Sequence, residues 1–305
     1  MRSRFLFYIV VNAVFLTLIA NLPLASALSS ASSASELSST ETPPSETSSS
    51  GLSPAELSAD LLSSPDQSQS NHSQNITPIY GYRVVRTYPH DKTAFTEGLV
   101  YDQGRLYEST GLYGRSELRL EDLETGEVLK RVSLPNGYFG EGIALWNDSI
   151  IQLTWHSNKG FIYNKESFNL TDNFTYPTEG WGMTSDGTYL IMSDGTDILH
   201  YLDPNTMKEV KQLMVRDRGG SVLELNELEY IQGLIYANYW PTYRIAIISP
   251  KTGEVVAWAD LEGIIKDTGS VDALNGIAYV SEEDRLFVAG KFYPEIMEIK
   301  LLKRG

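Results

Sequence analysis

Residues of the kinds that enzymes use for chemistry recur at one position of a repeated sequence pattern. In this pattern a polar or aromatic residue precedes Gly or Glu and then an apolar residue. The five copies are Glu97-Gly98-Leu99, Glu141-Gly142-Ile143, Trp181-Gly182-Met183, Asn226-Glu227-Leu228 and Asn275-Gly276-Ile277. Strand interiors disfavour Gly and Glu, so the pattern needs a reason. Carboxylates, amides and an indole that converge on one concavity predict an active site, where a carboxyl group can act as general acid and base.

The spacing of the five copies predicts the units that position these residues. The central positions, 98, 142, 182, 227 and 276, are separated by 44, 40, 45 and 49 residues. Each copy is followed by a second apolar strand, at 106–110, 150–155, 189–194, 234–240 and 286–291. A third strand and a turn come next. Repeats of about 40–45 residues with four short strands predict a β-propeller, and five copies predict five blades. A sandwich of five similar hairpins is the alternative.

The last unit has no fourth strand after IMEIKLL, at 296–302. The segment GYRVVRTY, at 81–88, precedes the first copy and could supply that strand. This pairing would close the ring and remove an exposed strand edge. The predicted fold is therefore all-β, a five-bladed β-propeller whose last blade is closed by the N-terminal strand of the domain, with almost no helix.

A propeller brings equivalent positions of its blades together around the mouth of the central channel. The leading residues of the five copies should meet there: Glu97, Glu141, Trp181, Asn226 and Asn275. The ends of the second strands and the residues before the two glutamates add Trp155, Trp240, Lys291, Phe95 and Phe139. Each aromatic residue taken alone is more often a core residue, but the whole set predicts a site. We expect burial and the charge of Glu97 to raise the pKa of Glu141, and the bare backbone of its flanking glycines to let a substrate terminus approach. Because Gly98, Gly182 and Gly276 repeat the feature, we expect Gly142 to be part of the architecture and not special to catalysis.

The N-terminal region divides into two segments before the domain. Residues 1–27 combine two arginines, an apolar run and the small-x-small pattern Ala25-Ser26-Ala27, which predict a signal peptide. An uncleaved membrane anchor is the alternative. Residues 28–79 are Ser-rich and predict a disordered linker, and residues 80–305 form the predicted catalytic propeller domain. The N-x-S/T sequons are Asn71, Asn75, Asn147, Asn169 and Asn173. With the signal peptide they predict a glycoprotein that is secreted or extracytoplasmic, and bound to a membrane only through an uncleaved anchor.

Composition excludes several classes of function. The 305-residue chain has a formal net charge of −15, which argues against nucleic-acid binding because that needs a basic surface. It has no Cys, so disulfides and thiolate metal sites are excluded. The four histidines, at positions 72, 90, 156 and 200, do not have the spacing of a zinc site. We therefore predict no metal site in the protein from these residues.

Eight short motifs then suggest a family. They are FTEGL (95–99), ESTGLYGRS (108–116), YFGEGI (138–143), GWGM (180–183), LNELEY (225–230), ANYW (237–240), LNGIA (274–278) and AGKF (289–292). In this order they resemble the plant-type glutaminyl cyclases, also called glutamine cyclotransferases, from about Tyr80 to Leu301. The resemblance implies a five-bladed propeller and a zinc-independent acyltransferase. Its activity would be glutaminyl-peptide cyclotransfer, in which N-terminal glutamine of peptides and exported proteins becomes pyroglutamate and ammonia is released.

The resemblance also implies roles for individual residues. The catalytic acid of the family lies in its FGEG motif, which assigns that role to Glu141. The substrate pocket would comprise Phe95, Phe139, Trp155, Trp181, Asn226, Trp240 and Lys291. Glu97 departs from the plant pattern, which has Gln there, and this leaves its role open because a carboxylate cannot donate a hydrogen bond. No cofactor is required, although a structural calcium ion in the channel is compatible with the resemblance.

A second class of function stays open from the residues alone. The same ring could bind a ligand without turnover, or form the site of a calcium-dependent, lactonase-like propeller. In that alternative Glu141, Asn226 and Asn275 would provide calcium ligands, because calcium takes carboxylate and amide oxygens. Turnover of a Gln-initiated peptide in the presence of a chelator would separate the two classes.

Overall fold

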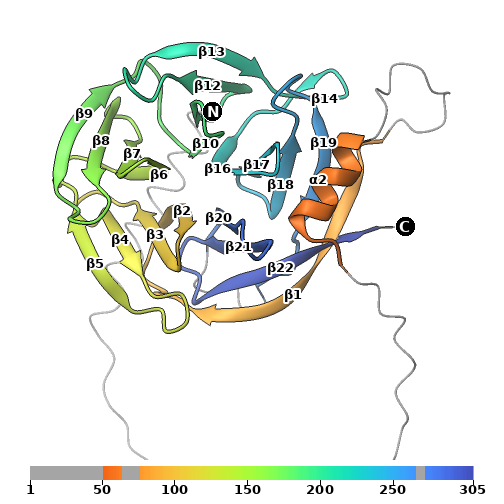
Figure 1. The fold of residues 1–305 in the computed structure, drawn as a ribbon, viewed down its shortest axis with the longest axis horizontal. Helices are drawn as coiled ribbons and strands as arrows, with labels where there is room; N and C mark the ends of the chain where they lie inside the picture. The colour runs from red at the N-terminus through yellow and green to blue at the C-terminus, as the bar shows by residue number, and fades with distance from the viewer. Residues whose placement is uncertain (1–50, 64–75, 266–271, 305) are drawn as a thin grey trace, which may run out of the picture. The chain divides into compact units, whose positions relative to one another are not determined.

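The computed structural model describes residues 51–63, 76–265 and 272–304 (Figure 1). Within these residues the regular structure is almost entirely β-strand, with one helix, α2 (Pro54–Ser63). The predicted all-β class is therefore confirmed. None of the helical structure in these three stretches is long and apolar enough to cross a membrane. The predicted signal peptide, residues 1–27, lies outside the described residues.

Three four-stranded antiparallel sheets follow one another along the chain. The first contains β2 (Thr96–Asp102), β3 (Arg105–Thr110), β4 (Glu117–Glu121) and β5 (Val128–Ser133). The second contains β6 (Gly140–Trp146), β7 (Ser149–Thr154), β8 (Lys159–Asn164) and β9 (Leu170–Thr175). The third contains β10 (Met183–Ser185), β11 (Leu190–Met192), β12 (Ile198–Leu202) and β13 (Glu209–Met214). A two-stranded ribbon of β14 (Arg216–Asp217) and β15 (Gly220–Ser221) comes next.

The remaining strands form one sheet of eight, in the order β16-β17-β18-β19-β1-β22-β21-β20. They are β16 (Leu225–Ile231), β17 (Leu234–Tyr239), β18 (Arg244–Ile248), β19 (Val255–Asp260), β1 (Ile79–Pro89), β22 (Glu295–Lys303), β21 (Arg285–Gly290) and β20 (Leu274–Val280). Strand β1 is antiparallel to β22 from Tyr80 opposite Lys303 to Pro89 opposite Glu295. The prediction that segment 81–88 lies beside the C-terminal strand is therefore confirmed.

The sheets follow one another around a ring (Figure 1). Strands β2, β6, β10, β16 and β20 are innermost in this view, and each contacts the next around the circle. Apolar side chains form five clusters of described residues, four between neighbouring sheets and one between the two halves of the eight-stranded sheet. In one of them Tyr107 of β3 packs with Ile143 of β6. Full burial of such a side chain contributes about 1.5–3 kcal/mol, so these clusters hold the sheets together.

Helix α2 corrects the prediction that residues 28–79 form a disordered linker, because residues 51–63 of that segment are ordered. The Ser53 hydroxyl accepts from the Glu56 N–H at 3.4 Å, and the Glu56 carboxylate accepts from the Ser53 N–H at 2.8 Å. This reciprocal pair is a capping box that starts a helix. Leu57 of the helix is fully buried among apolar residues of the eight-stranded sheet. Serine-rich composition hid this signal in the sequence.

Candidate active site

Four of the five repeated motifs lie where the pairing register of an innermost strand shifts. The register of the innermost strands shifts at 96/98, 140/143, 225/228 and 274/277. A β-bulge of this kind bends a strand and redirects a side chain. The shifts contain Glu97, Glu141, Asn226 and Asn275, whereas Trp181 stands just before β10 begins. The ring residues therefore lie where regular pairing stops, which explains why Gly and Glu are tolerated in these strands.

Glu97 and Lys291 form a buried ion pair. Lys291 Nζ lies 3.0 Å from Glu97 Oε1 and 4.6 Å from the centre of the Phe95 ring. Asn275 Nδ2 donates to Glu97 Oε2 at 2.8 Å. Burial raises the pKa of Glu97 to about 7, although Lys291 and Asn275 favour its ionised form. Burial opposes the charge on Lys291, but Glu97 and Glu141 raise its pKa, so the lysine is positively charged at neutral pH.

The Glu141 carboxyl group is buried and accepts no hydrogen bond from any other group in the described part of the chain. Burial raises its pKa well above the ordinary value, the charge of Glu97 raises the pKa further, and Lys291 opposes the rise. The Ser109 hydroxyl donates to the main-chain oxygen of Glu141 and so fixes the backbone. Burial and Glu97 therefore favour the protonated form of Glu141, and both of its carboxyl oxygens are available to a ligand.

The surroundings of Gly142 agree with its predicted part in the architecture. A Cβ atom at this position would lie 2.6 Å from Trp181 O and from Met183 N. The Gly142 N–H also donates to Trp181 O at 2.6 Å. The glycine is therefore needed for the close approach of β6 to the chain that enters β10, and not for the approach of a substrate.

Aromatic rings form the walls of the site in two groups. Phe139 contacts Phe95 and Trp155 edge to face, at centroid distances of 5.9 and 5.5 Å. Trp181 and Trp240 contact each other in the same geometry at 6.0 Å. Edge-to-face pairs stabilise by about 0.5–1.5 kcal/mol beyond simple burial. The structure thus brings all five predicted aromatic residues into two contacting groups.

Glu179 joins these two groups and was not predicted. Its Oε2 accepts from Nε1 of Trp155 at 2.8 Å and from Nε1 of Trp181 at 3.0 Å. Its Oε1 lies 3.2 Å from Nδ1 of His156, and its side chain is 41% exposed. The charge of Glu179 also contributes to the raised pKa of Glu141. A single carboxylate therefore orients two indoles and adds negative potential to the site.

A sequence signal for Glu179 existed. Glu179-Gly180 repeats the Glu-Gly dipeptide of Glu97-Gly98 and Glu141-Gly142. It falls outside the repeated position, because it precedes the copy at 181–183 by two residues. Ser193 was also not predicted, and no pattern in the sequence marks it. Its hydroxyl accepts from Gly182 N and donates to Asn226 O, each at 2.7 Å.

The two predicted amides differ in their surroundings. Asn275 donates a hydrogen bond to Glu97, whereas Asn226 contacts Ser193 through its main-chain oxygen. The side-chain oxygens of both residues are buried and accept no hydrogen bond within residues 51–63, 76–265 and 272–304. A buried acceptor without a partner is unfavourable, so each of these oxygens can bind an N–H group of a ligand.

Glu227 occupies the position that is glycine in the other four copies. Its Oε1 accepts from Leu99 N at 3.2 Å and its Oε2 from Ile277 N at 2.9 Å. One side chain of β16 thereby joins β2 and β20. Calcium needs six to eight oxygen ligands, and both oxygens of Glu227 are already used. Glu227 is therefore not available as a ligand for a calcium ion in the channel.

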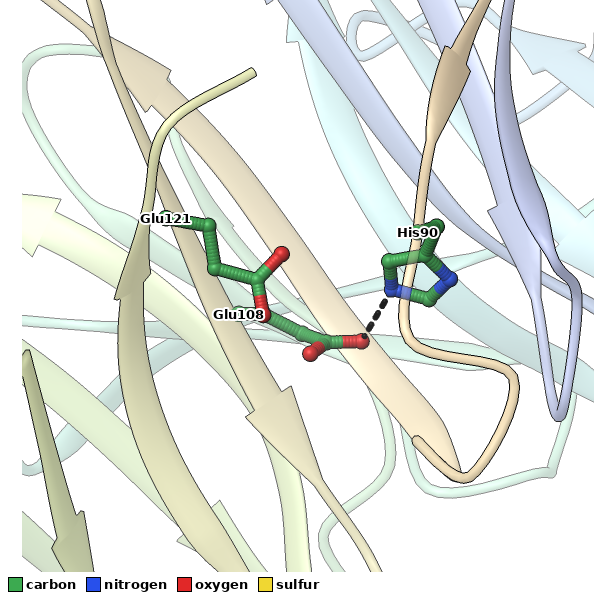
Figure 2. Close-up of side chains that lie close together, drawn as sticks. All are labelled: His90, Glu108 and Glu121. Atoms are coloured by element: carbon green, nitrogen blue, oxygen red, sulfur yellow. Dashed lines mark hydrogen bonds and ion pairs between the residues drawn. The ribbon is translucent and has the colours of Figure 1, made fainter. Parts of the chain in front are cut away.

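A second buried group lies outside the predicted site. Figure 2 shows His90, Glu108 and Glu121 pointing toward one another, with His90 Nε2 3.1 Å from Glu108 Oε1. Their types and proximity suit a metal ion. Arg119 Nη1, however, lies 3.5 Å from Glu108 Oε2 and 3.8 Å from Glu121 Oε1. The guanidinium already provides the positive charge that a metal ion would bring.

This group supports the segments that carry site residues. His90 Nδ1 donates to Tyr293 O at 2.7 Å, two residues after Lys291, and the Thr96 hydroxyl donates to Glu108 at 2.7 Å. Burial opposes protonation of His90, but Glu108 raises the pKa of the imidazole to about 9. Burial and the charge of Glu108 raise the pKa of Glu121 to about 9 as well. At neutral pH His90 is therefore positively charged and Glu121 is protonated, and the group holds the Thr96 and Tyr293 segments in place.

Comparisons with known proteins identify the family of the chain. The sequence profile of the family described as Glutamine cyclotransferase matches residues 56–301. An Arabidopsis thaliana protein named Glutaminyl-peptide cyclotransferase is 44% identical over 225 residues, which cover 72% of this chain and 70% of the relative. The crystal structure of Myxococcus xanthus Glutaminyl Cyclase is similar with a TM-score of 0.71 and 32% identity, over 75% of this chain and 100% of that one. The chain therefore belongs to the glutamine cyclotransferase family.

Proposed function

We propose that this protein converts N-terminal glutamine of peptides to pyroglutamate and releases ammonia, as a zinc-independent acyltransferase. One observation carries the proposal. In a member of the glutamine cyclotransferase family, Glu141 is a buried carboxyl group with a raised pKa and no hydrogen-bonding partner among the described residues, beside a charged lysine and aromatic walls. These are the properties of a general acid and base poised near neutral pH.

The proposed reaction is internal to the substrate. The α-amine, whose pKa is near 8, attacks the side-chain amide carbon, and the amide C–N bond then breaks. Protonated Glu141 gives its proton to the departing amide nitrogen and takes a proton from the attacking amine. Ammonia leaves and the carboxyl group returns to its starting state, so no other reactant is needed. Aromatic walls hold the chain in the folded geometry that attack requires.

The charge that develops on the amide oxygen needs a donor. The indole N–H groups of Trp155 and Trp181 bind Glu179, and Asn275 Nδ2 binds Glu97. We therefore assign stabilisation of the oxyanion to Lys291, with the amide of Asn226 as the second donor. Removal of one such donor commonly costs about 10²–10³ in turnover.

We also propose that the ring is a five-bladed propeller. In this interpretation the eight-stranded sheet comprises two blades, β16–β19 and the set β20, β21, β22 and β1, joined where β1 runs parallel to β19 for two residues. Five apolar clusters support that count, four between neighbouring sheets and one between the two halves of the eight-stranded sheet. The N-terminal strand of the domain would then close the last blade.

We propose further that the enzyme needs no cofactor and acts on exported proteins and peptides. The absence of Cys and the closure of the His90 group by Arg119 support metal independence. The signal-peptide pattern supports a secreted or extracytoplasmic location, with membrane attachment only through an uncleaved segment. The sequons at Asn147, Asn169 and Asn173 are exposed, as glycosylation requires; those at Asn71 and Asn75 lie outside the described residues. A mass shift on enzymatic deglycosylation tests this last point.

The test of the proposed function is direct. The purified protein is incubated with a Gln-initiated peptide, with and without a chelator, and ammonia and the cyclised peptide are measured. Turnover that survives chelation is expected. A folded protein that releases no ammonia would leave a binding protein as the better account, and turnover lost on chelation would restore a metal-dependent site such as that of the lactonase-like alternative.

A further inference from the structure

A cavity of about 320 Å³ lies beside the candidate site and shares two walls with it. Phe95, which packs on Phe139 of the site, also lines the cavity. So does Gly111, where a Cβ atom would lie only 3.0 Å from Glu97 Oε1. The cavity therefore begins within one residue's width of the Glu97 carboxylate.

The charges of this cavity differ from those of the protein as a whole. Three arginines line it, at 115, 119 and 131, against two carboxylates, Asp91 and Glu117. The chain as a whole has a net charge of −15. The two carboxylates are engaged, since Arg119 contacts Asp91 at 3.1 Å and Glu117 at 2.9 Å.

Two of the arginines remain open to a ligand. Arg115 is exposed and forms no ion pair with any residue in the described parts of the chain. Arg131 is 63% exposed and reaches Glu117 only at 3.7 Å. Guanidinium groups bind carboxylates in a planar, two-pronged geometry. The open charge of the cavity therefore suits an anionic side chain.

We propose that this cavity binds the residues that follow the N-terminal glutamine of a peptide substrate and favours acidic side chains there, through Arg115 and Arg131. The inference rests on the proposed function. An extended chain advances about 3.3–3.6 Å per residue, so a peptide whose glutamine lies beside Glu141 and Glu97 brings its second and third residues over Phe95 and Gly111. The cavity lies at that point.

The test compares kcat/KM for amidated peptides that begin with Gln and carry Asp, Ala or Lys at position two or three. Asp peptides are expected to exceed Lys peptides by about two- to fivefold at low salt, the range for partly exposed ion pairs, and the difference should shrink as salt is added. In the double variant Arg115→Glu with Arg131→Glu, the ratio of Asp to Lys peptides should fall below one. The control Arg83→Glu reverses one charge at an exposed strand residue outside the cavity and should leave that ratio as in the wild type.

The outcomes separate this inference from the function on which it rests. Equal kcat/KM for Asp and Lys peptides in the active wild-type protein overturns the acidic preference and leaves the cyclase function intact. An equal change of the ratio in Arg83→Glu attributes the effect to overall charge and also overturns the cavity. A folded protein that cyclises none of the peptides overturns both.

Discussion

Two buried glutamates on innermost strands, Glu141 of β6 and Glu227 of β16, differ in what their carboxyl groups contact. Burial raises the pKa of both groups well above the ordinary value. Both oxygens of Glu227 accept main-chain N–H groups, from Leu99 and Ile277. The carboxyl group of Glu141 has no such partner in the part of the chain that the structure describes.

The difference separates a structural carboxyl group from a chemical one. A raised pKa alone does not distinguish the two residues, because burial perturbs both. Glu227 uses both carboxyl oxygens to hold β2, β16 and β20 together. Glu141 keeps its capacity for a substrate, while Lys291 and Glu97 set its electrostatic surroundings. Whether a buried carboxyl group has hydrogen-bond partners therefore indicates its role better than its pKa does.

The largest expected effect is on turnover when Glu141 is changed. In Glu141→Gln, kcat for a Gln-initiated peptide should fall by at least about 100-fold, because an amide cannot carry a proton between two nitrogens. The free energy of unfolding should change little, since no described group donates to this carboxyl. Ammonia release and urea unfolding measure the two quantities. Near-wild-type turnover would remove Glu141 from the mechanism.

The same change at Glu227 should have the opposite signature. Glu227→Gln leaves one oxygen to serve two N–H groups, and a buried donor without a partner costs about 1–3 kcal/mol. The matched control is Glu229→Gln. One oxygen of Glu229 accepts from Tyr279 N at 3.1 Å and the other accepts from the Thr184 hydroxyl at 3.3 Å. The glutamine oxygen can keep the first contact, and its NH2 group can donate to the hydroxyl in the second. Urea unfolding should show a clear loss for Glu227→Gln and a smaller one for Glu229→Gln. Equal losses would contradict the role of Glu227.

Glu179 should show an intermediate effect, on substrate binding. Glu179→Ala removes the acceptor of the Trp155 and Trp181 indoles, and KM is expected to rise about tenfold, as for a lost hydrogen bond to a charged group. Glu179→Gln keeps one acceptor oxygen and should lie between Ala and the wild type. Near-ultraviolet circular dichroism reports the indole environment and should change in Glu179→Ala. Identical kinetics in both variants and the wild type would contradict the claim that Glu179 orients the two indoles for substrate binding.

The sequence predicts the innermost strands and the ring of site residues, but not the side-chain contacts that join neighbouring strands. The five copies of the pattern gave the innermost strands, and the ten predicted site residues follow from them and from the family motifs. The bulges depend on local register, and the cross-connection by Glu227 joins residues 50 or more positions apart. The Arg119 network joins residues up to 28 positions apart. One sequence displays none of these contacts. Glu179 stands between repeats, and helix α2 was hidden by its serine-rich surroundings although Ser53 and Glu56 form a capping box.

The smallest expected effect concerns Glu97. Glu97→Gln should keep kcat within about threefold, because Gln still offers an oxygen to Asn275 and the proposed reaction does not use the charge of Glu97 directly. The variant removes the group whose pKa is about 7 and a negative charge that raises the pKa of Glu141. The pH dependence assigned to Glu141 should therefore move to lower pH. A pH–rate profile checks the shift; complete inactivity would instead make Glu97 essential.

The most direct test of the account is a titration of the Glu141 carboxyl group itself. Carboxyl-labelled glutamate is incorporated, and carbon NMR follows the resonances with pH in the wild-type protein and in Glu141→Gln, which assigns the signal. The account predicts a resonance that titrates well above 4.5 and is missing in the variant. A Glu141 resonance that titrates near 4.5 would contradict the central claim that burial and Glu97 raise the pKa of this carboxyl group.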